Sequence, residues 1–454
     1  MDKKYIITRK IKLYPVGDKD EVDRVYQYLR DGIYNQNKAF NILLSHVYTS
    51  IVTGKTVDEI NLIYKKGKRN PKENNPDYSL YGYGEIVFSK GMPVASTVGQ
   101  KVKAYFGQAK KDGLFKGKVS LQNRKLDAPL WIEKATFSFY HEYETHLEFL
   151  DHLYKKDLKI YMKFPNKIIF DVNLGNNINK SREIRSVFKN IFEEQYEVLG
   201  SSIQIDDGTI ILNLTLKIPV VEIKLDENTV VGVDLGVAVP AFCALNNNDY
   251  VRLRIGSADD FIRMRTKLQS QRRRLQAQLK NTNGGHGRKK KLKALDRLHK
   301  NESNFVATYC HMVSRRIVDF AVKNNAKYIN LECLKGYDSS EMILRNWSYY
   351  KLQQYVIQKA ERYGIEVRFV NPCYTSQVCS FCGYWDKNQR KNQSDFVCSN
   401  PDCKSHNKDY YVNADYNAAR NIAKSTLFLD NSSVNKISKK HFEEAKEYYN
   451  IIEE

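Results

Sequence analysis

The sequence predicts a multidomain α+β protein. An N-terminal β module would hold a helical insert, and a following α/β domain would hold a small cysteine-rich insert. Three observations predict this class. Short stretches of period-two hydrophobicity occupy much of residues 135–220, which indicates strands. Apolar residues recur at helical spacing in two stretches within 21–115. Four of the eight cysteines lie between Cys379 and Cys403, a cluster typical of metal binding in a reducing compartment.

The composition points to a polyanionic partner. The 454 residues are enough for two to four domains. Lys and Arg number 73 against 52 Asp and Glu, a formal charge of +21, which favours nucleic acid first and an anionic membrane second. The 31 Tyr and 20 Phe suit base stacking as well as packing. No run approaches about 18 apolar residues, and the charged start Met-Asp-Lys-Lys-Tyr lacks a signal-peptide apolar region. We therefore expect a cytoplasmic protein without a membrane partner.

The N-terminal half alternates between the two periods. Residues 4–14 alternate apolar and basic side chains, which predicts a strand with one basic face. Helices are predicted over 21–52 and 95–111, with a polar loop at 64–78. Short strands are then predicted at 135–139, 146–150, 158–164, 167–172, 202–205 and 209–218, around one helix at 181–196. Several short strands with turn signals predict a small barrel or a curled sheet.

A carboxylate ends the first strand of the C-terminal half. The valine-rich run 230–233 predicts a buried strand, and Asp234 follows it directly. A buried carboxylate normally comes with a partner or a metal. Gly232 and Gly236 flank it and leave room for another backbone, a metal or a substrate. In an isolated Asp-Leu-Gly, however, an Asp that caps a turn is the commoner case.

Two further carboxylates change that interpretation. Glu332 ends a predicted strand over 328–332, and Asp415 lies at the start of a predicted helix. An Asp at a helix start is often only a cap. Three converging carboxylates repel one another and stay ionised only around cations, and their hard oxygen ligands select Mg²⁺. Two such ions about 4 Å apart can clamp both the attacking and the leaving oxygen of a phosphodiester. Asp234, Glu332 and Asp415 thus predict an RNase H-like nuclease site.

The cysteine cluster predicts one zinc ion. Cys379 and Cys382 form a Cys-x-x-Cys pair followed by Gly, and Cys398 and Cys403 form a second pair with four residues between them. Tetrahedral Cys₄ zinc is the expected outcome, with Cys373 and His406 as spare candidates. Reduced cysteines scattered in a loop would fit the paired spacing poorly. A segment with so few apolar residues needs the metal to fold.

A basic helix pair is the candidate nucleic-acid contact. Helices are predicted at 259–279 and 288–324, separated by a glycine-rich break. Residues 263–300 hold fourteen Lys or Arg and one acid, Asp296. A solvated face is the alternative to phosphate contact. The candidates for phosphate contact are Arg272, Arg273, Arg274, Arg288, Lys289, Lys290 and Lys291.

These motifs together resemble a known family. The segments are Val-Gly-Val-Asp234-Leu-Gly-Val, Gly284-Gly-His-Gly-Arg-Lys, Ile-Asn-Leu-Glu332, Asn346-Trp-Ser-Tyr-Tyr-Lys-Leu-Gln-Gln, Tyr374-Thr-Ser-Gln-Val-Cys-Ser-Phe-Cys-Gly and Asn413-Ala-Asp415-Tyr-Asn-Ala-Ala-Arg-Asn-Ile-Ala. Over about 226–425 they resemble the RuvC domain and zinc ribbon of miniature type V-F CRISPR effectors, and of the transposon-encoded TnpB nucleases. Upstream, the resemblance is one of layout only. The wider Cys398–Cys403 spacing departs from the family pattern.

The resemblance implies a domain plan. It places a wedge-like β-barrel at 1–20 and 116–225, a helical recognition domain at 21–115, a RuvC-like nuclease domain at 226–370 and 411–454, and a target nucleic-acid-binding zinc ribbon at 371–410. It also implies a guide RNA, a double-stranded DNA target, an RNA-dependent homodimer and a prokaryotic host.

The function expected from this resemblance is RNA-guided DNA cleavage. One Mg²⁺-dependent RuvC site would cut both strands of DNA beside a short flanking motif that the protein reads. A TnpB-type transposon nuclease would use the same chemistry with an RNA that its element encodes. A non-cleaving, guide-directed DNA-binding protein is the third possibility, and the intact Asp234, Glu332 and Asp415 argue against it.

Overall fold

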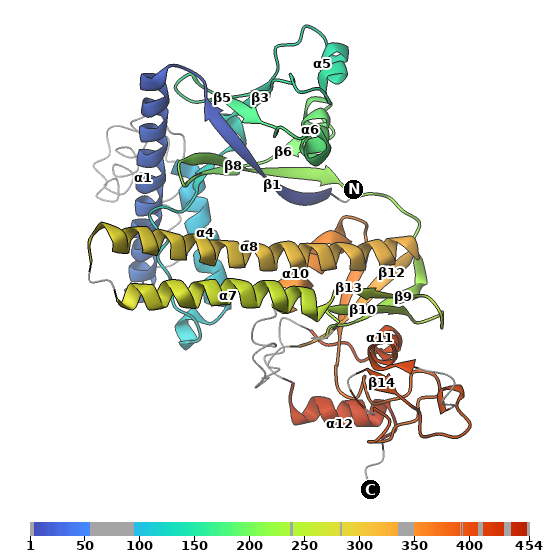
Figure 1. Ribbon diagram of the computed structural model, residues 1–454. Coiled ribbons are helices and arrows are strands. Elements are labelled where there is room, and N and C mark those ends of the chain that lie inside the picture. Colours follow the sequence, from blue (N-terminus) through green and yellow to red (C-terminus); the bar gives the residue numbers. More distant parts are fainter. Residues whose placement is uncertain are drawn as a thin grey trace. The chain divides into compact units, whose positions relative to one another are not determined.

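The chain forms two compact units in the computed structural model, Met1–Pro219 and Val220–Glu454 (Figure 1). The structure describes residues 4–54, 95–236, 239–281, 284–334, 349–390, 392, 394–406, 412–430 and 437–451. The loop predicted at 64–78 lies outside these ranges. Within them, no helix combines the length and the hydropathy needed to cross a membrane.

An antiparallel eight-stranded sheet forms the frame of the N-terminal unit. Its path is β2-β7-β8-β1-β5-β4-β3, and β6 pairs with β8 off this path. Among the described strands, the end strands β2 and β3 do not pair with each other, so the sheet is open rather than a closed barrel. The bounds are β1 (Lys4–Pro15), β2 (Leu130–Ile132), β3 (Ser138–Tyr140), β4 (Tyr161–Phe164), β5 (Ile168–Asn173), β6 (Glu197–Val198), β7 (Ser201–Asp206) and β8 (Thr209–Pro219).

The alternation in β1 produces the predicted two faces. Ile11 and Leu13 are buried in the core of the N-terminal unit, whereas Lys10 and Lys12 are exposed. The prediction of a strand with one basic face is therefore confirmed.

Among the described residues, four helices and two short 3₁₀ turns accompany this sheet. They are α1 (Lys19–Val52), α4 (Ala95–Lys111), α5 (His146–His152), α6 (Ile178–Phe192), η1 (Leu114–Lys116) and η2 (Lys134–Thr136). The predictions for α1 and α4 are confirmed. The strand predicted at 146–150 is wrong, because this stretch forms α5. The Thr145 hydroxyl caps the helix by accepting from the Glu148 N–H at 3.1 Å, and Phe149 is fully buried.

A mixed five-stranded sheet is the frame of the C-terminal unit. Its order is β11-β10-β9-β12-β13, with β9, β12 and β13 parallel and the hairpin strands β10 and β11 antiparallel. The bounds are β9 (Asp226–Asp234), β10 (Ala241–Leu245), β11 (Arg252–Ile255), β12 (Ala326–Glu332) and β13 (Glu366–Val370).

Helices cover both faces of this sheet (Figure 1). On one face, Val231 and Val233 of β9 pack with α8 (Gly285–Lys323) and α10 (Tyr349–Glu361). On the other face, Phe242 and Ala244 of β10 pack with Ala419 of α11 (Ala414–Lys424). The remaining elements are α7 (Ala258–Lys280), α12 (Lys439–Tyr448), η3 (Lys404–His406) and the small ribbon β14 (Asp395–Phe396) with β15 (Val412–Asn413). The helices predicted at 259–279 and 288–324 correspond to α7 and α8.

Candidate functional site

Two of the predicted carboxylates end neighbouring parallel strands. Val233 of β9 pairs with Leu331 of β12, so the register brings the next residues, Asp234 and Glu332, to the same edge of the sheet. Asp415 lies in the first turn of α11, which packs on β9 and β10. All three carboxylates therefore come from elements that meet at the carboxyl ends of β9 and β12.

Gly232 lets α11 lie directly on the sheet. A Cβ atom at this position would lie 2.0 Å from the carbonyl oxygen of Ala419 and 2.2 Å from the amide nitrogen of Ala423. Only glycine permits so close an approach of two backbones. The sequence left open what fills the space beside this glycine, and the structure places the backbone of α11 there.

Burial and mutual repulsion perturb the three carboxyl groups. Burial raises the pKa of Asp234 well above its usual value, and the charges of Glu332 and Asp415 raise it further. Burial raises the pKa of Glu332 to about 7 and also raises the pKa of Asp415. Carboxylates in this state ionise fully only when a cation offsets the repulsion. The donors are all oxygens, and this ligand set fits Mg²⁺.

The carboxylates are gathered less tightly than the cysteines described below. Among the residues that the structure describes, the four cysteines are the one group of three or more His, Cys, Asp or Glu side chains close enough together to hold a metal ion. The charges of Glu332 and Asp415 nevertheless act on the carboxyl group of Asp234.

An arginine of the zinc-ribbon segment, residues 371–410, acts electrostatically on the carboxylates. The charge of Arg390 lowers the pKa of Asp234, Glu332 and Asp415 alike, which opposes the larger effect of burial. Arg390 is exposed, and its Nε donates to the carbonyl oxygen of Asn392 at 3.4 Å. Sequence reasoning missed this residue, because no local pattern marks which positive charge of the ribbon acts on the carboxylates.

Buried asparagines hold α11 in place. The side-chain amide of Asn330 in β12 donates to the carbonyl oxygen of Ile422 at 2.9 Å. The amides of Asn417 and Asn421 donate to the carbonyl oxygen of Val378 at 2.8 and 2.7 Å. The helix that carries Asp415 is thus tied both to the sheet and to the segment that leads into the ribbon. The Asn413–Ala423 motif contains two of these residues, but its spacing alone did not reveal their partners.

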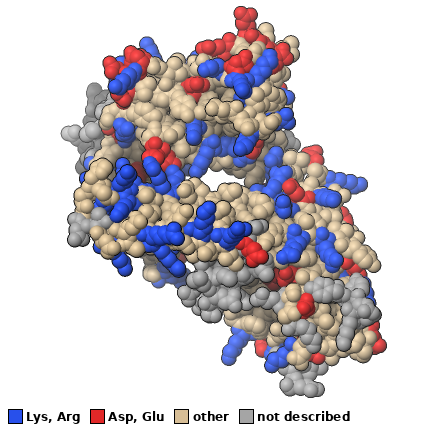
Figure 2. Space-filling view, in the orientation of Figure 1, with Lys and Arg blue, Asp and Glu red and all other residues tan. Residues whose placement is uncertain are grey.

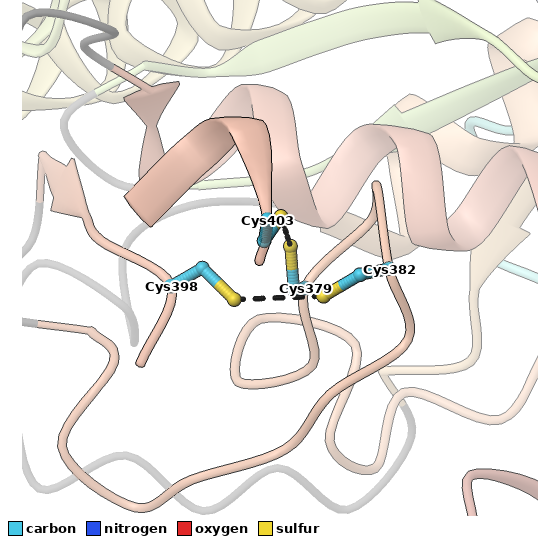
Figure 3. A group of neighbouring side chains, drawn as sticks. All are labelled: Cys379, Cys382, Cys398 and Cys403. Atoms are coloured by element: carbon cyan, nitrogen blue, oxygen red, sulfur yellow. Dashed lines mark hydrogen bonds between the residues drawn. The ribbon is translucent and has the colours of Figure 1, made fainter. Parts of the chain in front are cut away.

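The four predicted cysteines form one group (Figure 3). The sulfur atoms of Cys379 and Cys403 lie 3.7 Å apart, those of Cys382 and Cys398 lie 3.5 Å apart, and all four lie within 4.8 Å of one another. A tetrahedral zinc ion with Zn–S bonds of about 2.3 Å requires sulfur atoms about 3.8 Å apart. The group therefore fits a single Cys₄ zinc site despite the wider second spacing.

The spare candidates lie outside this group. Cys373 is buried, and its pKa is raised to about 12 by burial and by the charge of Glu332. The Nδ1 of His406 donates to the carbonyl oxygen of Cys398 at 2.7 Å, so His406 contacts the backbone of Cys398.

The zinc-ribbon segment also packs against the five-stranded sheet, because Cys379, Cys398 and Cys403 share an apolar cluster with Phe242 of β10.

The basic helix pair divides into braces and exposed charges. Arg272 forms an ion pair of 3.2 Å with the buried Glu302 of α8, and Arg288 donates to the carbonyl oxygen of Leu279 at the end of α7. Arg272 and Arg288, both predicted phosphate contacts, therefore also hold α7 and α8 together. Lys291 is partly exposed. Figure 2 shows Lys and Arg along α7 and α8. The exposed candidates are Arg273, Arg274, Lys289 and Lys290.

Known proteins share these sequence features. Residues 349–422 match the family model described as "Cas12f1-like, TNB domain", and residues 213–337 match the model described as "Probable transposase". The chain is 34% identical over 321 residues to the CRISPR-associated endodeoxyribonuclease Cas12f1 of Sulfoacidibacillus thermotolerans, covering 68% of this chain and 71% of that protein. It is 37% identical over 241 residues to the Cas12f1 of Syntrophomonas palmitatica, covering 47% of each.

A solved structure shares the fold. The protein in a cryo-EM structure of a Cas12f1–sgRNA–target DNA complex aligns with a TM-score of 0.64 over 93% of this chain and 99% of that chain, at 18% identity. This similarity extends over both units. The sequence resemblance is therefore confirmed, and the chain belongs to the Cas12f1 family of CRISPR-associated endodeoxyribonucleases.

Proposed function

We propose that this chain is an RNA-guided DNA endonuclease of a CRISPR type V-F system. It cuts double-stranded DNA beside a short flanking motif. The observation that carries the proposal is the position of Asp234 and Glu332 at the ends of neighbouring parallel strands, with Asp415 in the first turn of the helix that packs on them. Its relatives are named endodeoxyribonucleases, and the solved complex of similar fold contains a guide RNA and target DNA.

The nuclease centre is an RNase H-like, RuvC-type site. A mixed sheet with carboxylates at the ends of two central parallel strands supports this assignment. Asp234, Glu332 and Asp415 would hold two Mg²⁺ ions. When bound, Mg²⁺ stabilises charge on the phosphodiester oxygens and lowers the pKa of the attacking water.

Arg390 supplies the positive charge that the protein itself brings to the site. Its charge acts on all three carboxylates and would likewise attract a phosphate held there. A guanidinium binds phosphate through two parallel N–H donors, which would fix the orientation of the scissile group. Cys379, Cys382, Cys398 and Cys403 would hold one Zn²⁺ ion and thereby keep the ribbon that carries Arg390 folded.

Guide pairing and basic side chains would place the DNA. The guide RNA reads the sequence of one strand, and the protein holds the duplex by its backbone. The exposed charges on α7 and α8 suit this sequence-independent contact.

We place the wedge-like domain at 1–20 and 116–225, the recognition domain at 21–115, the nuclease domain at 226–370 and 411–454, and the target nucleic-acid-binding ribbon at 371–410. A chain this short offers limited surface for both an RNA scaffold and a heteroduplex, and we therefore propose an RNA-dependent homodimer in the prokaryotic cytoplasm.

A TnpB-type nuclease is the second candidate. The match of residues 213–337 to a probable-transposase model favours it, because the same catalytic chemistry would then serve a mobile element. The two candidates differ in their RNA. Sequencing the RNA that co-purifies with the protein distinguishes them: repeats and spacers of a CRISPR array support type V-F, whereas a transcript from the end of a transposon supports the alternative.

The direct test is guided cleavage. The chain, reconstituted with its guide RNA, is mixed with a plasmid library that carries the target beside randomised flanks. Cleavage of both strands that needs Mg²⁺, a matching target and a subset of flanks is the expected result. Guided binding without cleavage at any Mg²⁺ concentration would support the non-cleaving alternative.

A further inference from the structure

Glu332 is held by buried polar side chains that the proposed mechanism does not use. The backbone carbonyl of Glu332 accepts from Gln353 Nε2 at 2.8 Å, and its carboxylate atom Oε1 accepts from the Thr375 hydroxyl at 3.0 Å. Thr375 is only 1% exposed and Glu332 only 7%. We infer that Thr375 is a positioning residue whose hydroxyl orients the Glu332 carboxylate toward the cation site. The inference rests on the proposed function.

The Thr375 hydroxyl has one proton and two acceptors within reach. The carbonyl oxygen of Pro372 also lies 3.0 Å from Oγ1. The two distances are equal, but a hydrogen bond to an ionised carboxylate is stronger than one to a neutral carbonyl, so Glu332 is the favoured acceptor. The bond engages Oε1 and leaves Oε2 for a cation. It also restrains the terminal torsion of Glu332, which is broad in an unrestrained side chain.

Thr375 is itself fixed by the helix that carries Asp415. Its carbonyl oxygen accepts from the side-chain amide of Asn421 at 2.8 Å, and the backbone N–H of Ser380 donates to the Oδ1 of Asn417 at 2.8 Å. Both asparagines belong to α11. With the backbone fixed, the two acceptors hold the hydroxyl in one position. The position of Glu332 and the position of Asp415 are therefore set by one hydrogen-bonded unit.

Removing a hydrogen bond to a metal-ligating carboxylate typically weakens metal binding or activity. Loss of such a partner lowers metal affinity or activity by about 10–100-fold. Thr375→Val preserves the shape of the side chain and removes only the hydroxyl. Thr375→Ser keeps the hydroxyl and removes the methyl group. The pair therefore separates orientation of Glu332 from packing of the loop.

The test compares these variants in complex with guide RNA. Mn²⁺ is the probe ion, and its binding is followed by electron paramagnetic resonance. The Glu332→Gln complex lacks the carboxylate at the cation site, so the Mn²⁺ that it still binds measures the ions held by the RNA. We expect Thr375→Val to bind the protein-specific Mn²⁺ about 10–100-fold more weakly, and its cleavage midpoint to move to higher Mg²⁺. Guided DNA binding should be unchanged, and Thr375→Ser should behave as the unaltered protein. Thr136→Val, which removes a 2.7 Å hydroxyl bond to the carbonyl of Glu133 in the other unit, is the matched control.

The outcomes separate this inference from the proposed function. Mn²⁺ affinity and an Mg²⁺ midpoint unchanged in Thr375→Val would overturn the positioning role, while an inactive Glu332→Gln leaves the nuclease proposal intact. Full cleavage by Glu332→Gln would instead defeat the proposed function. If Thr375→Val does not fold, Thr375→Ser decides: weakened Mn²⁺ binding despite a retained hydroxyl would contradict the inference.

Discussion

Replacing Gly232 with alanine should separate the elements that carry the carboxylates. The added Cβ would lie 2.0 Å from the carbonyl oxygen of Ala419, whereas an ordinary contact begins at 3.4 Å, so α11 must move by about 1.4 Å relative to β9. Overpacking of this kind costs roughly 1–3 kcal/mol. For a unit of this size, that is a fall in melting temperature of about 2–4 °C per kcal/mol. A displacement of about 1 Å in a catalytic group lowers the rate about 100-fold.

The assay measures the single-turnover cleavage rate beside guided DNA binding and the melting temperature. Gly232→Ala should cut about 100-fold more slowly while its guided binding stays close to normal, because guide pairing does not involve α11. Gly107→Ala is the matched control, since no atom of the described residues beyond its own turns of α4 lies within 4 Å of the position of its Cβ. It should leave cleavage unchanged and stability unchanged or slightly higher. A Gly232→Ala protein that cuts at the normal rate would refute the close packing of α11 on β9.

The remaining predictions concern zinc, phosphate contacts and assembly. Elemental analysis should find about one zinc ion per chain. The zinc content should fall in Cys382→Ser and stay unchanged in Cys373→Ser, because Cys382 belongs to the four-sulfur group and Cys373 does not. An unchanged zinc content in Cys382→Ser would contradict the site. Neutralising Arg273, Arg274 or Lys289 should remove one phosphate contact. Each substitution should reduce the slope of log affinity for nucleic acid against log salt concentration by about 0.7–0.9, and an unchanged slope would assign the residue to a solvated face. Arg272→Gln should instead lower stability, since it removes the ion pair with the buried Glu302. Mass measurement of the reconstituted complex should give two protein chains per RNA, and one chain per RNA would favour the TnpB-type alternative.

Much of the C-terminal unit could be predicted from local pattern. The valine run before Asp234 and the apolar stretch before Glu332 are short and β-branched or aliphatic, and they form β9 and β12 as expected. The space beside Gly232 was predicted from its flanking position, although the partner could be identified only from the structure. The paired cysteine spacing was sufficient to select all four members of the sulfur group, because local turns bring each pair together.

Other features depend on contacts between distant segments. The alternation at 146–150 fits a strand, but the capping signal formed by Thr145 and Glu148 is satisfied and the stretch becomes α5. The charge of Arg390 and the hydroxyl of Thr375 act on the carboxylates only through the path of the ribbon and its entry segment, which no periodicity encodes. Arg272 looked like its neighbours in sequence, and its pairing with Glu302 arises from the packing of α7 against α8.

The most direct test of the central claim removes each carboxylate in turn and measures cleavage and guided binding on the same preparations. Asp234→Ala, Glu332→Gln and Asp415→Ala should each abolish cutting of both DNA strands, because each loss disrupts the shared cation site. Guided binding should remain, since RNA pairing and basic side chains provide it. The losses should be non-additive, with a double variant no worse than either single variant. Ca²⁺ should support binding but little cutting, because its variable coordination orients the attacking water poorly. Persistent cutting by Asp234→Ala would contradict a single site built from these three carboxylates.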